Sequence, residues 1–199
     1  MSADSASINL THHFLIAMPG LEDEVFSRSV VYLCEHSERG ALGLVINKPS
    51  DINLQSLFDK VDLPLGRSDL MNSPVFQGGP VQTERGFVLH EATFARGEAA
   101  AESAYLSTLA IPGGLEMTTS KDVLEALAGG GGPKKVLITL GYAAWGEGQL
   151  ESELGENSWL TVDANREVIF DTPVAERYER ALGLLGLQSW MISNQVGHA

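Results

Sequence analysis

The sequence contains one cysteine, Cys34, among its 199 residues, so it cannot form an internal disulfide. Disulfide-stapled folds of small secreted proteins are therefore excluded, and a reducing compartment fits this cysteine usage. No apolar run approaches the length of about 20 residues that a membrane-spanning helix needs. The opening segment MSADSASINL has neither a basic stretch nor a long apolar one, so no secretory signal is expected. We expect a cytoplasmic protein without membrane association.

Basic residues are also scarce. The chain carries 13 lysines and arginines against 26 aspartates and glutamates, which gives a formal net charge of −13. Its tightest basic cluster is the pair Lys134–Lys135, and no helix-turn-helix pattern is present. A chain this acidic repels a phosphate backbone unless its basic residues gather on one face. Direct contact with nucleic acid is therefore not expected, which disfavours a regulator that binds DNA itself.

The composition is that of an ordinary globular domain, with 44% hydrophobic and 20% charged residues. A chain of 199 residues can bury one substantial core. We expect residues 1–10 to form a flexible lead-in, 11–187 a single domain and 188–199 a C-terminal tail. We also expect the chain to be a monomer.

Short β-rich runs outnumber helical patterns along the chain. Phe14–Gly20 predicts a buried strand, while Ser29–His36 and Ala41–Pro49 predict a hairpin closed by the loop SERG. Pro74–Val81 and Gly86–Glu91 predict a second pair of strands. Further strands are expected at Ala104–Ile111, Lys135–Tyr142, Trp159–Asp163 and Glu167–Asp171.

Helical patterns lie between these runs. Apolar residues at i, i+3, i+4 and i+7 from Leu54 to Val61 predict one short helix. Others are expected from Ser120 to Ala128, from Glu147 to Leu154, and from Thr172 to Gly186. The order is too irregular for a doubly wound fold. The sequence therefore predicts a single-domain α/β sandwich, built on a mixed, largely antiparallel sheet with flanking helices.

Four glutamates follow the Lys135–Tyr142 strand, within the segment GYAAWGEGQLESELGENSWL. Glu147 and Glu151 share a helix face at i, i+4, while Glu153 and Glu156 lie further along. Paired carboxylates can do acid–base work when burial separates their pKa values. Because nothing in the sequence indicates such burial, we interpret the four glutamates as the solvated side of a helix.

Two glycine-rich segments raise the question of a ligand. In GGGGPKK, at 129–135, the glycines follow a helix and precede a strand, the reverse of a phosphate loop. In FQGGPV, at 76–81, Gly78, Gly79 and Pro80 lie beside an apolar strand, where a backbone or a ligand can approach closely. A tight loop between strands is the simpler interpretation of this second segment.

An enzyme, such as a small-molecule hydrolase, is the alternative. Cys34 and His36 stand at i, i+2 in one predicted strand, which would place them on the same face. His36 and His90 each end a predicted strand beside a glutamate. The hydrolase hypothesis requires these residues, or Glu151, to converge in one pocket. No zinc-ligand spacing is present, so neither a metal nor another cofactor is expected.

Four segments together resemble one family. They are FLIAMPGLEDEVFSRSVVYLCEHSERGALGLVINKP, VFQGGPVQTERGFVLH, TTSKDVLEAL and GYAAWGEGQLESELGENSWL. As a set they are similar to the YqgE/AlgH family of uncharacterised bacterial proteins, over Phe14–Leu187. One difference is Ala144, where the family often has glycine. The resemblance implies a cytosolic α/β sandwich without an established reaction or cofactor.

Some members of that family are labelled putative transcriptional regulators, and the charge of this chain favours regulation through a protein partner. The family's characteristic residues fall here on Asn47, Pro49, Gly78, Gly79, Pro80, Gly141, Tyr142, Trp145 and Trp159. Because they form turns and apolar surfaces, they suit binding better than catalysis.

We therefore expect a non-enzymatic binding or regulatory protein that takes an unidentified protein partner or small ligand in a shallow aromatic-lined cleft. The residues expected at this cleft are Phe76, Tyr142, Trp145, Trp159 and Asn47, with Gly78, Gly79 and Pro80 at its rim.

Overall fold

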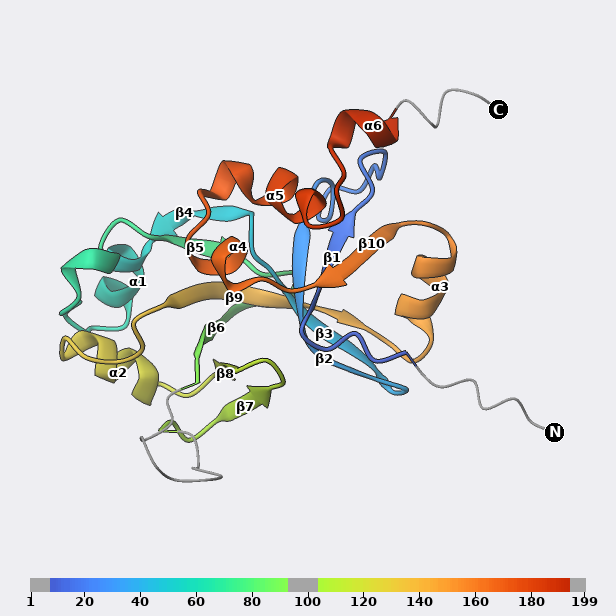
Figure 1. The fold of residues 1–199 in the computed structure, drawn as a ribbon. Coiled ribbons are helices and arrows are strands. Elements are labelled where there is room, and N and C mark those ends of the chain that lie inside the picture. The colour runs from blue at the N-terminus through green and yellow to red at the C-terminus, as the bar shows by residue number, and fades with distance from the viewer. Residues whose placement is uncertain (1–7, 93–103, 194–199) are drawn as a thin grey trace.

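The computed structural model describes residues 8–92 and 104–193, and it contains a curled sheet flanked by short helices (Figure 1). The strands are β1 (His13–Ala17), β2 (Val30–Ser37), β3 (Gly40–Val45), β4 (Pro49–Asn53), β5 (Pro74–Gln77), β6 (Val81–Glu91), β7 (Thr108–Ile111), β8 (Leu115–Thr118), β9 (Val136–Trp145) and β10 (Trp159–Asp163). The α-helices are α1 (Leu54–Lys60), α2 (Asp122–Ala128), α3 (Gln149–Gly155), α4 (Arg166–Phe170), α5 (Arg177–Gly183) and α6 (Ser189–Ser193). Single 3₁₀ turns lie at Ser68–Leu70 and Val174–Glu176.

The strands of the described residues form one sheet in the order β10-β1-β2-β3-β9-β6-β8-β7, with β4 and β5 attached at its side. Their pairings are antiparallel, apart from that between β5 and β9, which is parallel. The predicted α/β sandwich on a mixed, largely antiparallel sheet is thus confirmed. No helix in the described ranges has the length and apolar character needed to cross a membrane.

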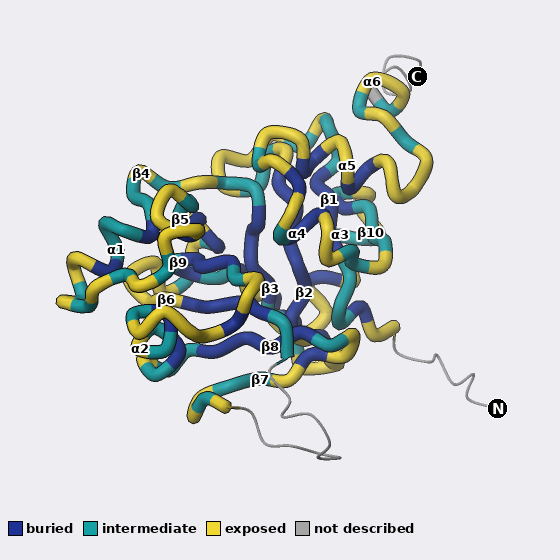
Figure 2. Tube along the Cα trace, turned by 60° about the vertical axis from the view of Figure 1, so that its left-hand side comes forward, coloured by how far each residue is buried: buried dark blue, intermediate teal, exposed yellow. Residues whose placement is uncertain are grey.

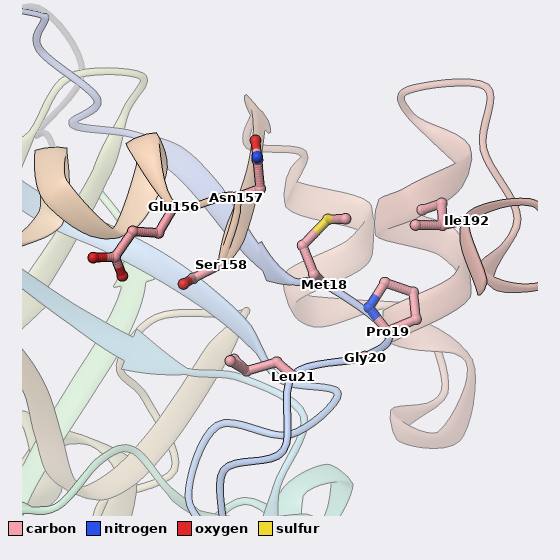
Figure 3. Close-up of a pocket in the computed structure, with 8 residues that line it drawn as sticks. All are labelled: Met18, Pro19, Gly20, Leu21, Glu156, Asn157, Ser158 and Ile192. Atoms are coloured by element: carbon pink, nitrogen blue, oxygen red, sulfur yellow. The ribbon is translucent and has the colours of Figure 1, made fainter. Parts of the chain in front are cut away.

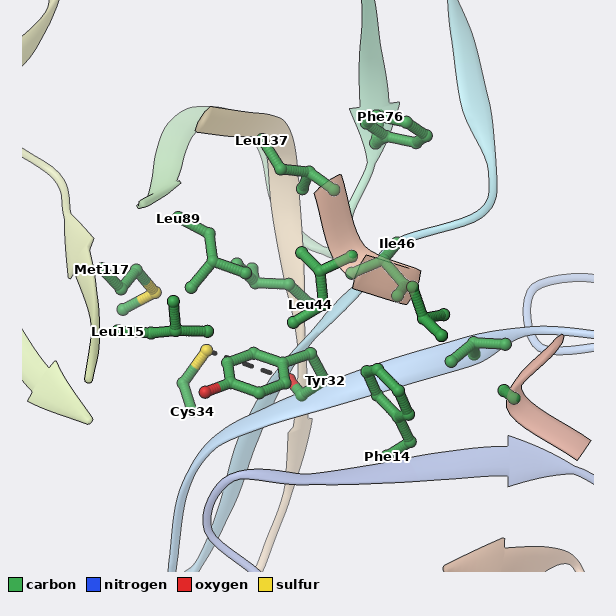
Figure 4. Close-up of a cluster of buried hydrophobic side chains, with 14 of the residues drawn as sticks. Phe14, Tyr32, Cys34, Leu44, Ile46, Phe76, Leu89, Leu115, Met117 and Leu137 are labelled. Carbon is green, nitrogen blue, oxygen red and sulfur yellow. Dashed lines mark hydrogen bonds between the residues drawn. The ribbon is translucent and has the colours of Figure 1, made fainter. Parts of the chain in front are cut away.

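Apolar side chains are buried on both faces of this sheet, so its central strands lie in the interior (Figure 2). On β2, Tyr32 and Cys34 belong to the largest core cluster, which also contains Phe14 and Leu44 (Figure 4). The alternate residues Val31 and Leu33 pack into a second cluster. A third cluster joins α1 and α2 to β6 and β9. Because strand side chains alternate in direction, one strand contributes to two cores.

The two predicted terminal segments are only partly described. Of the expected lead-in, residues 1–7 lie outside the described part of the chain, whereas Leu10 is buried and donates its N–H to the ring of His36. Of the expected tail, residues 194–199 lie outside the description, and Ser189–Ser193 form α6. Ile192 of α6 packs against the largest core cluster.

The strand predicted at Glu167–Asp171 is wrong, because this segment forms helix α4. The side chain of Asn165 accepts a hydrogen bond from the N–H of Val168 and so caps the helix. Val168 and Ile169 are β-branched, which favours a strand, but both bury against the main core from the helix. The cap and the packing together outweigh the intrinsic preference of these residues.

The strand pair predicted from Pro74–Val81 and Gly86–Glu91 is also wrong, because β5 and β6 do not pair with each other. Both pair with the same residues of β9, Thr139 and Leu140, and therefore lie on its two opposite edges. The connection through Gly78, Gly79 and Pro80 must cross over β9 to pass from one edge to the other. It crosses at Gly141 and Tyr142.

Glycine makes this crossing sterically possible. A Cβ at Gly79 would lie 2.1 Å from the carbonyl carbon of Tyr142, and one at Gly78 would lie 2.3 Å from the oxygen of Gly141. On β9 itself, Gly141 has a φ of +79°, and a Cβ there would lie 2.6 Å from the oxygen of Gly79. Real Cβ atoms do not approach other atoms this closely, so two backbones meet here without side chains between them.

We expect Gly141→Ala to reduce the free energy of unfolding by about 2 to 4 kcal/mol, because it adds both backbone strain and a steric clash. Urea unfolding followed by circular dichroism measures this loss. The matched control is Gly155→Ala in α3, where a new Cβ meets no atom within 4 Å. Equal stability of the two variants would contradict the crossing as described.

Candidate functional site

The aromatic residues of the expected cleft lie in two separate parts of the core. Trp145 and Trp159 are 5% and 4% exposed and pack together in the second cluster, with ring centroids 6.0 Å apart. Phe76 belongs to the largest cluster and the partly buried Tyr142 packs against that cluster, on the other face of the sheet. Tyr142 and Trp145 are three residues apart on β9, so their side chains point to opposite faces. The structure therefore does not bring these four side chains into one cleft.

The remaining residues of that expected site make backbone contacts. Gly78, Gly79 and Pro80 form the crossing over β9 described above. Asn47 accepts a hydrogen bond from the N–H of Val30 at 2.9 Å and donates one to the carbonyl of Arg28 at 2.9 Å. Its amide thus holds the end of β3 against the start of β2, a contact that sequence spacing alone does not indicate.

The glutamates of α3 are more than a solvated face. One carboxylate oxygen of Glu153 accepts hydrogen bonds from the indole N–H of Trp145, at 3.3 Å, and of Trp159, at 3.1 Å. Both tryptophans are buried, and an indole N–H needs a partner there. Glu153 therefore joins α3 to β9 and β10 through one shared acceptor, and the solvated interpretation is wrong for this residue.

Glu151 also has a partner, since its carboxylate lies 2.7 Å from Nε2 of the buried His36 ring. The other ring nitrogen, Nδ1, accepts the backbone N–H of Leu10 at 2.9 Å. Nε2 must then carry the proton that it donates to Glu151. Because both nitrogens are engaged, His36 has no free lone pair with which to act as a general base. Its contacts connect β2, the Leu10 segment and α3.

His90 and Cys34 do not join His36. Strands β2 and β6, which carry the two histidines, are separated in the sheet by β3 and β9. His90 donates from Nδ1 to its neighbour's carbonyl and accepts from the hydroxyl of Thr118 at Nε2, and burial lowers its pKa. Cys34 is 2% exposed, and burial raises the pKa of its thiol far above the usual range. It therefore lacks the thiolate character of a nucleophile.

A β-bulge also separates Cys34 from His36, contrary to the prediction that they share a face. The pairing of β2 with β3 shifts between Leu33 and Glu35, so Cys34 is an extra residue in its strand. One inserted residue reverses the alternation of side chains beyond it. Cys34 consequently points into the largest core, where Figure 4 shows it near Tyr32, while His36 points toward α3.

An apolar pocket of about 420 Å³ lies at the end of β1 (Figure 3). We call it the MPGL pocket, since its walls are Met18–Leu21, the turn Glu156–Ser158 after α3, and Ile192 of α6. The N–H of Met18 donates to the carbonyl of Ser158 at 3.0 Å and fixes two of these walls together. Sequence reasoning missed this site, although two of its walls fall within segments that carry the family resemblance.

Comparisons of this chain with family models, with protein sequences and with solved structures all point to the same family. A family model described as AlgH-like matches residues 14–190. Relatives named UPF0301 protein, from Acidovorax sp. (strain JS42) and Variovorax paradoxus (strain S110), are 75% and 73% identical over 199 residues, each covering 100% of both chains. The solution structure of the AlgH protein from Pseudomonas aeruginosa has a TM-score of 0.74 and 46% identity, with 100% of each chain covered.

A crystal structure of a protein from Corynebacterium diphtheriae has a TM-score of 0.68 and 22% identity. The match covers 87% of this chain and 85% of that one, and it shows likeness of fold alone.

We expect Glu153→Ala to reduce the free energy of unfolding by about 2 kcal/mol, because two buried indole N–H groups lose their acceptor. Glu153→Gln keeps an acceptor oxygen in place and should cost less than about 1 kcal/mol. Urea unfolding followed by circular dichroism gives both values. The control is Glu147→Ala, at an exposed position, with an expected change within about 0.5 kcal/mol. A Glu153→Ala variant as stable as this control would show that the shared acceptor is unimportant.

The contact between His36 and Glu151 predicts a pH-dependent stability difference. The backbone N–H of Glu151 and the hydrogen bond from His36 lower the pKa of this carboxyl below its ordinary value of 4.5. Because the pKa of Glu151 is lower in the folded than in the unfolded chain, its carboxylate stabilises the fold at pH values above 4.5. This stabilisation is lost as the pH falls through the pKa of the folded state. Glu151→Gln, which keeps the acceptor but removes the charge, should therefore be less stable than wild type at neutral pH.

The loss at pH 7 is expected to be under about 1 kcal/mol, because the Glu151 side chain is 46% exposed. It should shrink as pH falls below 4.5 and the carboxyl of the folded protein becomes protonated. Urea unfolding of both proteins across this pH range tests this, with Glu147→Gln as the exposed control. A difference that stays constant with pH would assign the effect to something other than the carboxylate charge.

Proposed function

This chain belongs to the AlgH-like family, and we propose that it is a non-enzymatic binding protein that captures a partner protein through the MPGL pocket. The partner inserts an apolar side chain between Met18–Leu21, the Glu156–Ser158 turn and Ile192. Basic residues flank that anchor on the partner and face the acidic surface around the pocket.

The size and lining of the MPGL pocket carry this proposal. Its volume of about 420 Å³ falls within the range of about 300 to 1,000 Å³ that is typical of ligand sites. Most of its lining is apolar, with Met18, Leu21 and Ile192 supplying side chains from two distant parts of the chain. A pocket of this kind suits a large apolar anchor residue, since such anchors dominate the energy of protein interfaces.

Exposed apolar residues lie close in sequence to two walls of the pocket. Trp190 and Met191 of α6 are 59% and 38% exposed, and Val25, in the loop after Leu21, is 43% exposed. Large apolar side chains of this exposure are typical of contact surfaces when they gather beside a pocket. Tryptophan in particular is enriched among the residues that contribute most to binding.

The charge around the pocket determines the chemistry of the partner. Glu22, Asp23 and Glu24 follow Leu21 directly and are exposed, as is Glu156 in the opposite wall. The carboxylate of Asp23 accepts the N–H groups of Val25 and Phe26, which holds this acidic loop in shape. Complementary lysines and arginines on a partner would raise the association rate and exclude acidic competitors.

The hydrolase alternative receives less support from the geometry. His36, His90 and Cys34 do not share a pocket, and each is engaged by structural neighbours. A direct DNA-binding role is disfavoured by the net charge of −13. Regulation through a protein partner remains compatible with both observations, and it is the form of regulation proposed here.

Gly20→Trp tests this function directly. Gly20 lines the pocket, and a Cβ there meets no atom within 4 Å, so a bulky side chain can be placed at the pocket without a clash of its Cβ. We expect immobilised Gly20→Trp to capture at least about tenfold less of the partner from a bacterial lysate than wild type does. Quantitative mass spectrometry measures the captured amounts.

The matched control is Gly155→Trp, which adds the same side chain at an equally open position in α3. It should capture as much partner as wild type. Capture should also weaken when salt rises from about 0.05 to 0.5 M, because the flanking charges are then screened. Identical capture profiles for Gly20→Trp and Gly155→Trp would refute the assignment of this pocket.

A further inference from the structure

A second cavity lies between α1 and α2, on the part of the sheet that these two helices cover (Figure 1). We call it the α1–α2 slot, and its volume is about 210 Å³. Its apolar walls are Leu57 and Val61 near α1, Leu124 of α2, and Val88, Ile138 and Leu140 of the sheet. The third core cluster fills the rest of this layer, so the slot is a local gap in an otherwise packed interface.

The mouth of the slot carries two cations. Arg85 and Lys121 line it, together with Glu84 and the Thr119–Ser120 segment. The ion pairs formed within 8–92 and 104–193 include neither Arg85 nor Lys121. Arg85 makes one long hydrogen bond, 3.3 Å, to the amide oxygen of Gln82. The Arg85 guanidinium also lies over the ring of Phe87, 5.8 Å from its centroid. Neither contact pairs the charge of Arg85 with a carboxylate, in a chain that has twice as many acidic as basic residues.

The backbone is distorted at the point that holds Arg85. Val81 pairs with Tyr142 and Gly86 pairs with Leu140, so Gln82–Arg85 stand opposite the single residue Gly141. Gln82 has a φ of 46°, which is uncommon for a residue other than glycine. Bulges and strained residues concentrate beside functional sites, where they aim a side chain. Arg85, the last residue of this bulge, is also one of the residues that line the slot.

We propose that the α1–α2 slot binds a small organic acid, whose branched or aromatic body lies between the helices and whose carboxylate contacts Arg85 and Lys121. The slot is smaller than the pockets that hold drug-sized ligands, which limits the apolar body to a few carbon atoms or one ring. A guanidinium matches the two oxygens of a carboxylate. Because Glu84 also lies at the mouth, a monoanion fits better than a phosphate dianion.

Titration of the ¹⁵N-labelled full chain with isovalerate and benzoate tests this site by NMR. The expected result is saturable shifts of amide signals from α1, α2 and β6. Isovaleramide and benzamide, which lack the charge, should bind at least about tenfold more weakly than the acids. No saturable shift with either acid, or equal affinity for acids and amides, would overturn the proposal.

Two variants locate the site. Gly86 lines the slot, and a Cβ there meets no atom within 4 Å, so Gly86→Leu fills the slot while leaving the backbone room. Arg85→Gln removes the guanidinium from an exposed side chain, together with its contact over the Phe87 ring. Each variant is expected to weaken acid binding at least about tenfold.

Gly155→Leu, at an open position in α3, is the control and should bind the acids like wild type. Thermal unfolding checks that all three variants remain folded. If Gly86→Leu failed to fold, Arg85→Gln would still decide the outcome. Acid binding that survives Arg85→Gln unchanged would overturn the proposal.

Discussion

The crossing of Gly78–Pro80 over β9 is the constraint on which the rest of this fold depends. Since β5 and β6 occupy opposite edges of β9, the chain between them has to pass over that strand. Two backbones meet at Gly141, where neither can carry a side chain. The crossing also sets the start of β6 opposite Tyr142, and the extra residues that follow form the Gln82–Arg85 bulge. The close approach of two backbones at Gly141 is thus followed directly by the bulge that carries the exposed, charged Arg85.

Contacts of helix α3 with the sheet hold one wall of the MPGL pocket in position. The helix has seven residues, too few for stability by itself, and it is held by tertiary contacts at three points. Glu151 meets His36, Glu153 meets two tryptophans, and Leu150 is buried in the second core cluster. The turn Glu156–Ser158 that follows is one wall of the MPGL pocket. The carboxylates of this helix therefore help to hold one wall of the pocket in place.

The two pockets differ in the charge that surrounds them. The MPGL pocket is bordered by Glu22–Glu24 and Glu156, whereas the α1–α2 slot opens between Arg85 and Lys121. Two apolar pockets select different ligands when one is bordered by negative charge and the other by positive charge. The two proposed ligands, a protein partner with basic residues and a small acid, would therefore occupy separate places on the chain.

Local sequence pattern predicts several of the strands and helices correctly. The β2–β3 hairpin, the buried strand β9 and helix α1 follow from alternation, turn residues and 3.6-residue spacing, and the acidic composition already argued against nucleic acid. The separation of Tyr142 from Trp145 was also accessible, because an odd spacing on a strand places two side chains on opposite faces. The irregular order of short strands and helices already predicted the fold class.

Other features follow from contacts between segments that are distant in the sequence. The bulge at Cys34 reverses the side of the sheet that His36 faces, and packing turned the β-branched Glu167–Asp171 segment into α4. The partners of Glu151 and Glu153 come from other strands. Both pockets combine residues from distant segments of the chain. Periodicity in the sequence predicts which residues share one face of a strand or helix. A site depends on which strands and helices meet in space, and long-range strand pairing alone determines those meetings.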